Sequence, residues 1–187
     1  MTSKRRLLVG AFLAAIIVAV GIALAVFKPW LLLVNTEINE EIPQAATSAS
    51  ATANTDSNAT HSPASETPSG PVVVSQGEFV SHEHTTTGNA RIYRLPDGSH
   101  QLTLENLNTS NGPDVRVWLS KGPVFEGFDG FFTAGEHPHL DIAPLKGNQG
   151  NQVYDLPADF NPNDWTAVDL WCEDFSVSFG AAALTAT

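Results

Sequence analysis

The residue with the widest chemical range in this sequence is its only cysteine, Cys172, in the stretch LWCEDFSVSFG (residues 170–180). A thiol can attack as a nucleophile, change its oxidation state, or bind a metal or a haem iron. A free cysteine can also pack in a core as a small apolar residue. Glu173 and Asp174 follow it directly, and nearby negative charge raises the pKa of a thiol. The sequence therefore argues against a nucleophilic thiolate and leaves redox, ligand and packing roles open.

Histidines supply the other candidate ligands, in two pairs with i, i+2 spacing: His82 with His84, and His137 with His139. In an extended strand each pair faces one way, and two such pairs could hold zinc or copper. Nothing in the spacing brings the pairs together, and exposed polar positions near strand ends are the simpler interpretation. A blue-copper site is excluded, because no histidine follows Cys172 and the only methionine is the first residue. We therefore predict no metal site.

Sequence motifs for hydrolysis are missing as well. The chain has no G-x-S-x-G, no H-E-x-x-H and no phosphate-binding glycine loop. From residue 71 onward it holds five Lys and Arg against fifteen Asp and Glu, a net charge of −10. Such a surface repels nucleic acid and anionic membranes. Nothing in the motifs or in the charge points to an ordinary hydrolase.

The N-terminal residues predict a membrane anchor. Residues 7–27 contain no charge and no proline, and as a helix they would span roughly 30 Å, the thickness of the hydrocarbon core. Three basic residues precede this run, which places residues 1–6 in the cytoplasm and the rest of the chain outside. A signal peptide cleaved near Ala23-Leu24-Ala25 is the alternative. Either interpretation exports the domain that carries Cys172, where an unpaired cysteine is unusual.

Composition divides the exported part of the chain. Residues 28–43 form a juxtamembrane segment with aromatic and leucine residues suited to the membrane interface. Residues 44–70 are almost entirely Ala, Ser, Thr, Asn and Pro, and such a segment cannot bury enough apolar surface to order itself. We predict a disordered linker there and one folded domain over residues 71–187.

The folded domain has the pattern of an all-β protein. Short apolar runs alternate with turn signals such as Pro96-Asp97-Gly98-Ser99. In VRVWLS, residues 115–120, valine and leucine alternate with polar residues and a tryptophan. No amphipathic helix and no βαβ spacing follow residue 71. We predict an antiparallel β-sandwich or barrel-like domain behind one transmembrane helix.

Residue parity places Cys172 within this domain. Val168, Leu170 and Cys172 share one face of a strand, whereas the apolar residues from Phe175 onward fall on odd positions. A change of phase exchanges the core and solvent faces. We therefore predict a bulge or bend at Glu173-Asp174 and an inward-facing Cys172 at a strand end.

Three segments, NGPDVRVWLS, LKGNQGNQVYDLP and VDLWCEDFSVSFGAAAL, resemble the electron-transfer DM-thirteen domain family over about residues 77–184. The resemblance implies a β-sandwich distantly related to DOMON domains, which bind haem or sugars. It also implies that Cys172, at the family's cysteine position, acts in redox chemistry as a bare thiol or as a ligand to a prosthetic group such as haem. The segment from Phe125 to Leu140 departs from the family pattern, and the methionine ligand of DOMON domains has no counterpart.

The sequence thus favours a membrane-anchored, extracytoplasmic domain that takes part in electron transfer through Cys172, with a redox protein as partner and no nucleic-acid partner. The alternative is a non-catalytic cell-surface binding or structural module with an inert, buried Cys172. The sequence does not identify an electron donor, an acceptor or a cofactor.

Overall fold

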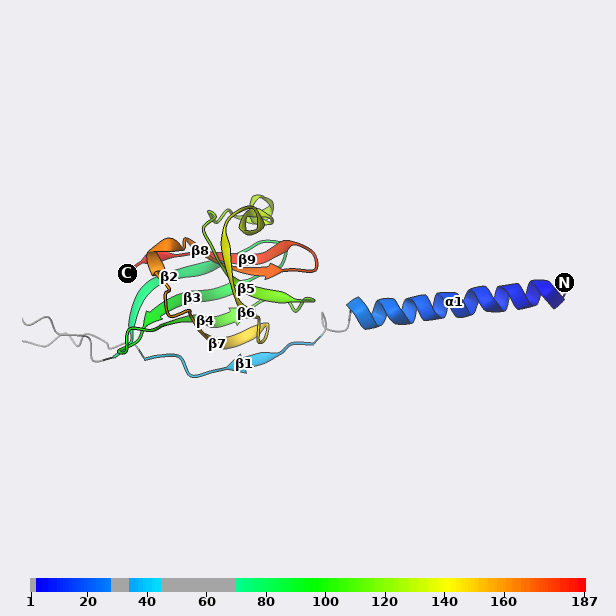
Figure 1. Cartoon of the computed structure of the whole chain (residues 1–187), viewed down its shortest axis with the longest axis horizontal. Coiled ribbons are helices and arrows are strands. Elements are labelled where there is room, and N and C mark those ends of the chain that lie inside the picture. The colour runs from blue at the N-terminus through cyan, green and yellow to red at the C-terminus, as the bar shows by residue number, and fades with distance from the viewer. Residues whose placement is uncertain (1–2, 28–33, 45–69) are drawn as a thin grey trace, which may run out of the picture.

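The computed structural model describes residues 3–27, 34–44 and 70–187 (Figure 1). It contains one α-helix, α1 (Ser3–Phe27), and a β domain. The strands are β1 (Glu37–Asn39), β2 (Val72–Ser81), β3 (Thr87–Arg94), β4 (His100–Asn108), β5 (Val115–Ser120), β6 (His139–Pro144), β7 (Gln149–Asp155), β8 (Ala167–Cys172), β9 (Val177–Ala183) and β10 (Thr185–Ala186). Three short 3-10 helices are η2 (Gly127–Gly130), η3 (Thr133–Glu136) and η4 (Pro162–Asp164). The predicted linker, residues 44–70, lies almost wholly outside the described residues.

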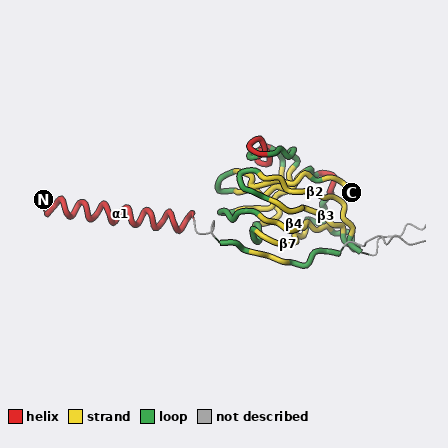
Figure 2. The backbone as a smooth tube through the Cα atoms, turned by 180° about the vertical axis from the view of Figure 1, so that it is seen from behind, coloured by secondary structure: helices red, strands yellow, loops and turns green. Residues whose placement is uncertain are grey.

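The helix α1 extends away from the β domain in both ribbon views (Figures 1 and 2). Within residues 3–27, 34–44 and 70–187, no helix meets the combined length and hydropathy required of a membrane span.

The β domain is one curled sheet. Among the described residues its strands follow the order β1-β7-β4-β3-β2-β9-β8-β5-β6, and β10 pairs with β2 beside this path. Strand β2 joins the two halves, because its first part pairs with β3 and its last part, Phe79–Ser81, pairs with β9. The sheet therefore bends into a half-barrel, with β7, β4 and β3 facing β8 and β5 across the core (Figures 1 and 2).

The core forms where the strands alternate as the sequence predicts. Val115, Val117 and Leu119 of β5 are buried against Val168 and Leu170 of β8. The neighbouring strands add Ile92, Leu102, Leu104, Tyr154 and Phe179 to the same cluster. The prediction of a β domain is confirmed, and so are the faces predicted for residues 115–120 and 168–172.

The sheet is mixed rather than wholly antiparallel, which corrects the predicted topology. Strand β1 pairs in parallel with β7, Glu37 opposite Gln149 and Asn39 opposite Asn151. The Glu40 carboxylate then accepts hydrogen bonds from the Val153 backbone N–H at 2.7 Å and from Lys146 Nζ at 2.7 Å. These contacts attach part of the segment predicted as juxtamembrane to the edge of the domain. A three-residue strand carries too little pattern to be recognised in a sequence.

The change of phase after Cys172 lies at the predicted position, Glu173-Asp174, and is a hairpin turn rather than a bulge within one strand. Strands β8 and β9 form the hairpin, and the chain turns between Glu173 and Ser176, where Ser176 adopts φ 52°. Cys172 and Val177 are directly paired across this hairpin, so they face the same side of the sheet. The turn thus returns Val177 and Phe179 to the core, and a register shift further along β9 brings Ala182 there as well.

Candidate functional site

Cys172 occupies the last position of β8 and has no exposed surface. It faces the core beside Val115 and Val177, its partners on the two adjacent strands. Its thiol donates a hydrogen bond to the carbonyl oxygen of Pro113 at 3.0 Å. The structure therefore places Cys172 inward at a strand end, as the parity of β8 predicts, beneath the loop that precedes β5.

The surroundings of Cys172 hold its thiol in the protonated form. Burial is the largest influence and raises the pKa of the thiol. The backbone N–H groups of Phe175 and Asp174 oppose this rise, while the carboxylates of Asp174 and Asp114 add to it. Since the thiolate is the nucleophilic form, this cysteine is unsuited to nucleophilic attack at neutral pH.

The packing around Cys172 also determines whether a haem could bind there. The side chains around the sulfur belong to the main core cluster, including Val115, Leu170, Val177 and Phe179. Across Phe179 lies Gly112, where an added Cβ would come within 2.6 Å of the phenyl ring. A porphyrin could reach the sulfur only by displacing these close-packed groups. The residues around Cys172 do not fit a haem, and no step through haem is derived.

An aromatic stack lies on the opposite, outer face of β5 and β8. The ring of Trp118 stacks on His139 with centroids 3.6 Å apart and planes within 2°. It also stacks on Trp171, with centroids 4.9 Å apart and planes at 18°. Both tryptophans are buried, whereas His139 is exposed. Trp171 directly precedes Cys172, so one peptide unit links the stack to the thiol-bearing residue.

A buried polar chain runs beside this stack. His82 Nε2 lies 2.8 Å from the carbonyl oxygen of Phe125, and His82 Nδ1 lies 2.7 Å from Ser178 Oγ. Ser178 Oγ lies 2.8 Å from Asp169 Oδ2. All three side chains are at most 8% exposed. We call His82, Ser178 and Asp169 the polar relay.

The protons that these hydrogen bonds require restrict the relay to two protonation arrangements. The Phe125 carbonyl can only accept, so His82 Nε2 carries a proton. If Ser178 donates to His82 Nδ1, then Asp169 must be protonated and donate to Ser178. If Ser178 donates to Asp169, then His82 must be doubly protonated. In both arrangements the relay binds one proton more than it would with a neutral His82 and an ionised Asp169.

The directions of the pKa shifts select the neutral arrangement. Burial raises the pKa of Asp169 to about 8, against a smaller lowering by Ser178. Burial also lowers the pKa of His82, with partial compensation from the Phe125 carbonyl. A protonated Asp169 and a neutral His82 therefore coexist at neutral pH.

Two buried side-chain polar atoms in the described part of the chain have no hydrogen-bond partner, Trp118 Nε1 and Asp169 Oδ1. One is a donor and the other an acceptor, and their residues are directly paired between β5 and β8. A cavity of about 10 Å³, the size of one water molecule, is lined by Asp169, His82, Ser120 and Thr133. The outer face of β5 and β8 therefore carries further buried polar atoms beside the relay.

The histidine pairs do not form a joint site. His82 belongs to the relay, His84 contacts Glu83 and Phe179, His137 Nδ1 lies 2.8 Å from the Thr133 carbonyl, and His139 stacks on Trp118. No group of three or more His, Cys, Asp or Glu side chains with metal-binding geometry occurs among the described residues.

Sequence reasoning missed the relay and the stack, although β8 carried a signal for both. Asp169 is an acidic residue inside the strand AVDLWC, all six residues of which are buried. A carboxylate is almost never fully buried without a partner. Trp118 and Trp171 are likewise large aromatics on the face that the alternation assigns to solvent.

Because of the relay, we expect the free energy of unfolding to fall as the pH rises from about 6.5 to 8. The folded Asp169 binds its proton up to about pH 8, whereas an unfolded Asp releases it near 3.9. Below about 6.5 the lowered pKa of His82 gives the opposite slope, because the unfolded His is then the form that binds a proton. Above 6.5 only the Asp169 effect remains, at most about 1.4 kcal/mol per pH unit.

Urea denaturation at pH 6.5, 7.0, 7.5 and 8.0 measures this slope. Asp169→Asn, which has no proton to lose, is expected to remove it. A wild-type free energy of unfolding that is constant over this range, or an equal fall in Asp169→Asn, would contradict the assignment.

A family model described as electron transfer DM13 matches residues 78–184. This range contains the thiol, the aromatic stack and the polar relay, and it covers more than half of the 187 residues. Neither the curated proteins nor the solved structures contain a match to the chain.

Proposed function

The chain belongs to the electron-transfer DM13 family, and from this membership we propose that its β domain exchanges single electrons with a partner protein, with Cys172 as the redox residue. The observation that carries the proposal is the placement of Cys172 one peptide unit from a buried tryptophan stack that reaches the exposed His139. The stack offers a route by which an electron passes between the buried thiol and the surface.

The proposed step is a one-electron oxidation of a protonated thiol. The Cys172 S–H bond breaks, the electron passes through Trp171 and Trp118 to a one-electron acceptor in the partner, and a thiyl radical remains. The proton passes to Asp114 or Asp174, the carboxylates whose charge acts on the thiol. Re-reduction by one electron and one proton restores the thiol. This step needs no thiolate, which agrees with the raised pKa of Cys172.

The alternative is a structural role for Cys172. Full burial, an apolar environment and a satisfied S–H hydrogen bond are typical of an inert core cysteine. In that case the domain is a binding or structural module, and its aromatic stack serves packing alone.

The experiment that tests the proposal measures electron release by the purified full-length chain. In an anaerobic titration with a one-electron oxidant we expect the chain to give up at most one electron from Cys172, and Trp118→Leu is expected to slow this transfer at least tenfold without changing the total. The absorption spectrum of the same sample shows whether a coloured group copurifies. No electron release at accessible potentials would contradict the proposal.

We also propose that the domain is held at the outer face of a membrane. The support is the uncharged run of residues 7–27 after three basic residues, and the nine large apolar side chains that α1 exposes between Val9 and Leu24. A membrane would cover these side chains, whereas water would leave them exposed.

Protease added to intact cells tests this location. We expect cleavage between residues 44 and 70, the predicted linker, and release of a fragment that contains the β domain. Protection of the whole chain, or a mature N-terminus near Val26, would contradict the proposed anchor.

A further inference from the structure

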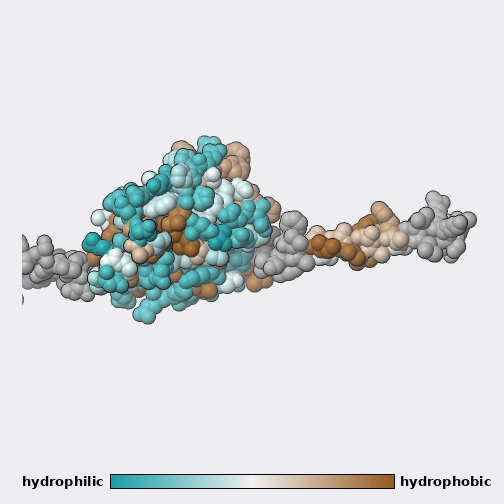
Figure 3. Space-filling view, in the orientation of Figure 1, coloured by the Kyte–Doolittle hydropathy of each residue, from teal (hydrophilic) through white to brown (hydrophobic). Residues whose placement is uncertain are grey.

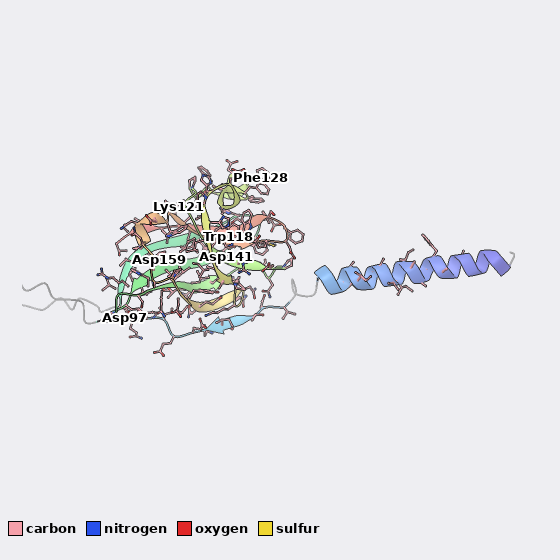
Figure 4. The ribbon with its side chains drawn as sticks, viewed as in Figure 1. Asp97, Trp118, Lys121, Phe128, Asp141 and Asp159 are labelled. Carbon is pink, nitrogen blue, oxygen red and sulfur yellow. The ribbon has the colours of Figure 1, made fainter. Side chains whose placement is uncertain are left out.

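An exposed cluster of phenylalanines lies on the segment between β5 and β6. The side chains of Phe125, Phe128 and Phe132 are 49%, 73% and 47% exposed. We call these three residues the aromatic patch. Phe128 marks the patch at the top of the domain, above Trp118, in Figure 4.

Aromatic contacts hold two rings of the patch, Phe128 and Phe132, together. The centroids of Phe128 and Phe132 lie 6.1 Å apart in an edge-to-face arrangement, and the half-buried Phe131 lies 5.2 Å from Phe128. Phe131 is anchored to the sheet, because its carbonyl accepts a hydrogen bond from the Ser178 backbone N–H at 2.8 Å. The patch is therefore fixed on the sheet with its rings toward solvent, which is typical of an interaction surface.

Acidic residues surround the patch. Glu126, Asp129 and Glu136 are all exposed, and no lysine or arginine occurs between Lys121 and Lys146. Hydrophilic and hydrophobic residues accordingly alternate at the top of the domain in Figure 3. An apolar centre with a rim of one charge fits a partner whose apolar centre has a rim of the opposite charge.

The patch segment also covers the aromatic stack. Ala134 is buried in one cluster with Trp118 and Trp171. Gly135 lies directly on the Trp171 ring, where an added Cβ would come within 2.6 Å of Cη2. A protein docked on the patch would therefore be separated from the stack by a single layer of chain.

We propose that the aromatic patch and its acidic rim form the docking surface for a basic, one-electron carrier protein. This inference rests on the proposed electron-transfer function and names the chemistry of its partner. The acidic rim makes a membrane a poorer occupant, because anionic headgroups repel it and attract basic segments instead. The apolar centre supplies affinity, and the acidic rim supplies orientation and association rate.

The test measures binding separately from electron transfer. Full-length chain is titrated with oxidised cytochrome c, a basic one-electron carrier, and affinity is measured by calorimetry at several salt concentrations. Phe128→Ser is expected to weaken binding about tenfold. Phe175→Ser, on another exposed phenylalanine (58% exposed against 73% for Phe128) in the β8–β9 turn, is expected to leave it unchanged. The double change Glu126→Gln and Asp129→Asn is expected to reduce the salt dependence more than Asp97→Asn with Asp159→Asn, which lie elsewhere on the domain (Figure 4).

Each alternative outcome of these binding measurements leads to a different conclusion. If the patch variants and the control variants changed cytochrome c binding equally, binding would depend on net charge alone, and the docking surface would be overturned. An unchanged affinity for cytochrome c in Phe128→Ser would also overturn the docking surface and leave a membrane as the occupant of the patch. Binding at the patch together with no electron release in the oxidant titration would support the docking surface and contradict the proposed function instead.

Discussion

Cys172→Ser is expected to abolish the electron release of the full-length chain to a one-electron oxidant while leaving most of the protein folded. A serine hydroxyl has no accessible one-electron oxidation, so no radical can form at this position. Its hydroxyl can donate to the Pro113 carbonyl as the thiol does, which limits the loss of stability to about 1–3 kcal/mol. Redox titration together with urea denaturation separates the two effects.

Cys172→Ala is the matched control for packing, because alanine keeps the site apolar but lacks both sulfur and hydroxyl. We expect both variants to lose electron release to the same extent despite different stabilities. A folded Cys172→Ser protein with unchanged electron release would assign the cysteine to the core alone. Alkylation of the wild-type thiol near neutral pH is expected to be slow, since the thiol is buried and its pKa is raised.

Ser178→Ala is expected to destabilise the domain by about 2–5 kcal/mol, because it removes one hydroxyl that serves two buried partners. His82 Nδ1 and Asp169 Oδ2 each lose their contact with that hydroxyl, and an unsatisfied buried polar group costs about 1–3 kcal/mol. Urea denaturation at pH 6.5 measures the loss.

Ser120→Ala provides the comparison for this prediction. Ser120 is equally buried, and its side-chain oxygen accepts one hydrogen bond, from the Gly122 backbone N–H at 3.0 Å. We expect a loss of only about 1 kcal/mol there. Similar losses in the two variants would show that Ser178 does not link His82 with Asp169. Nitrogen NMR of His82 provides an independent check, with a proton on Nε2 and none on Nδ1 at neutral pH.

Local pattern predicted the inward faces of the strands but not their arrangement in space. Alternation in β5 and parity in β8 assigned Val117, Leu170 and Cys172 to the core, because side chains of a strand point alternately to its two faces. The pairing of β2 with β9 depends on contacts between residues about a hundred positions apart, and a single sequence carries no direct signal for such contacts.

The same limit applies to the functional site. The cysteine was evident because it is the only one, and its raised pKa followed in part from the adjacent acids. The relay was not evident, since His82 and Ser178 lie 96 positions apart and each is unremarkable in its own segment. The phenylalanines of the aromatic patch were visible in the sequence, but alternation could not show which of them remain exposed.

The pairing of β2 with β9 and β10 also determines the order in which the domain can assemble. Strand β2 opens the domain near residue 72, and its partners β9 and β10 are the last strands of the chain. During synthesis, β2 can form a local hairpin with β3, and β3 with β4. The other edge of β2 stays unpaired until residues 177–186 have been made. Such long-range pairing slows folding and leaves an open strand edge until the chain is complete. A chain truncated before β9 would keep that edge, so loss of the C-terminal strands is expected to favour aggregation over a partly active domain.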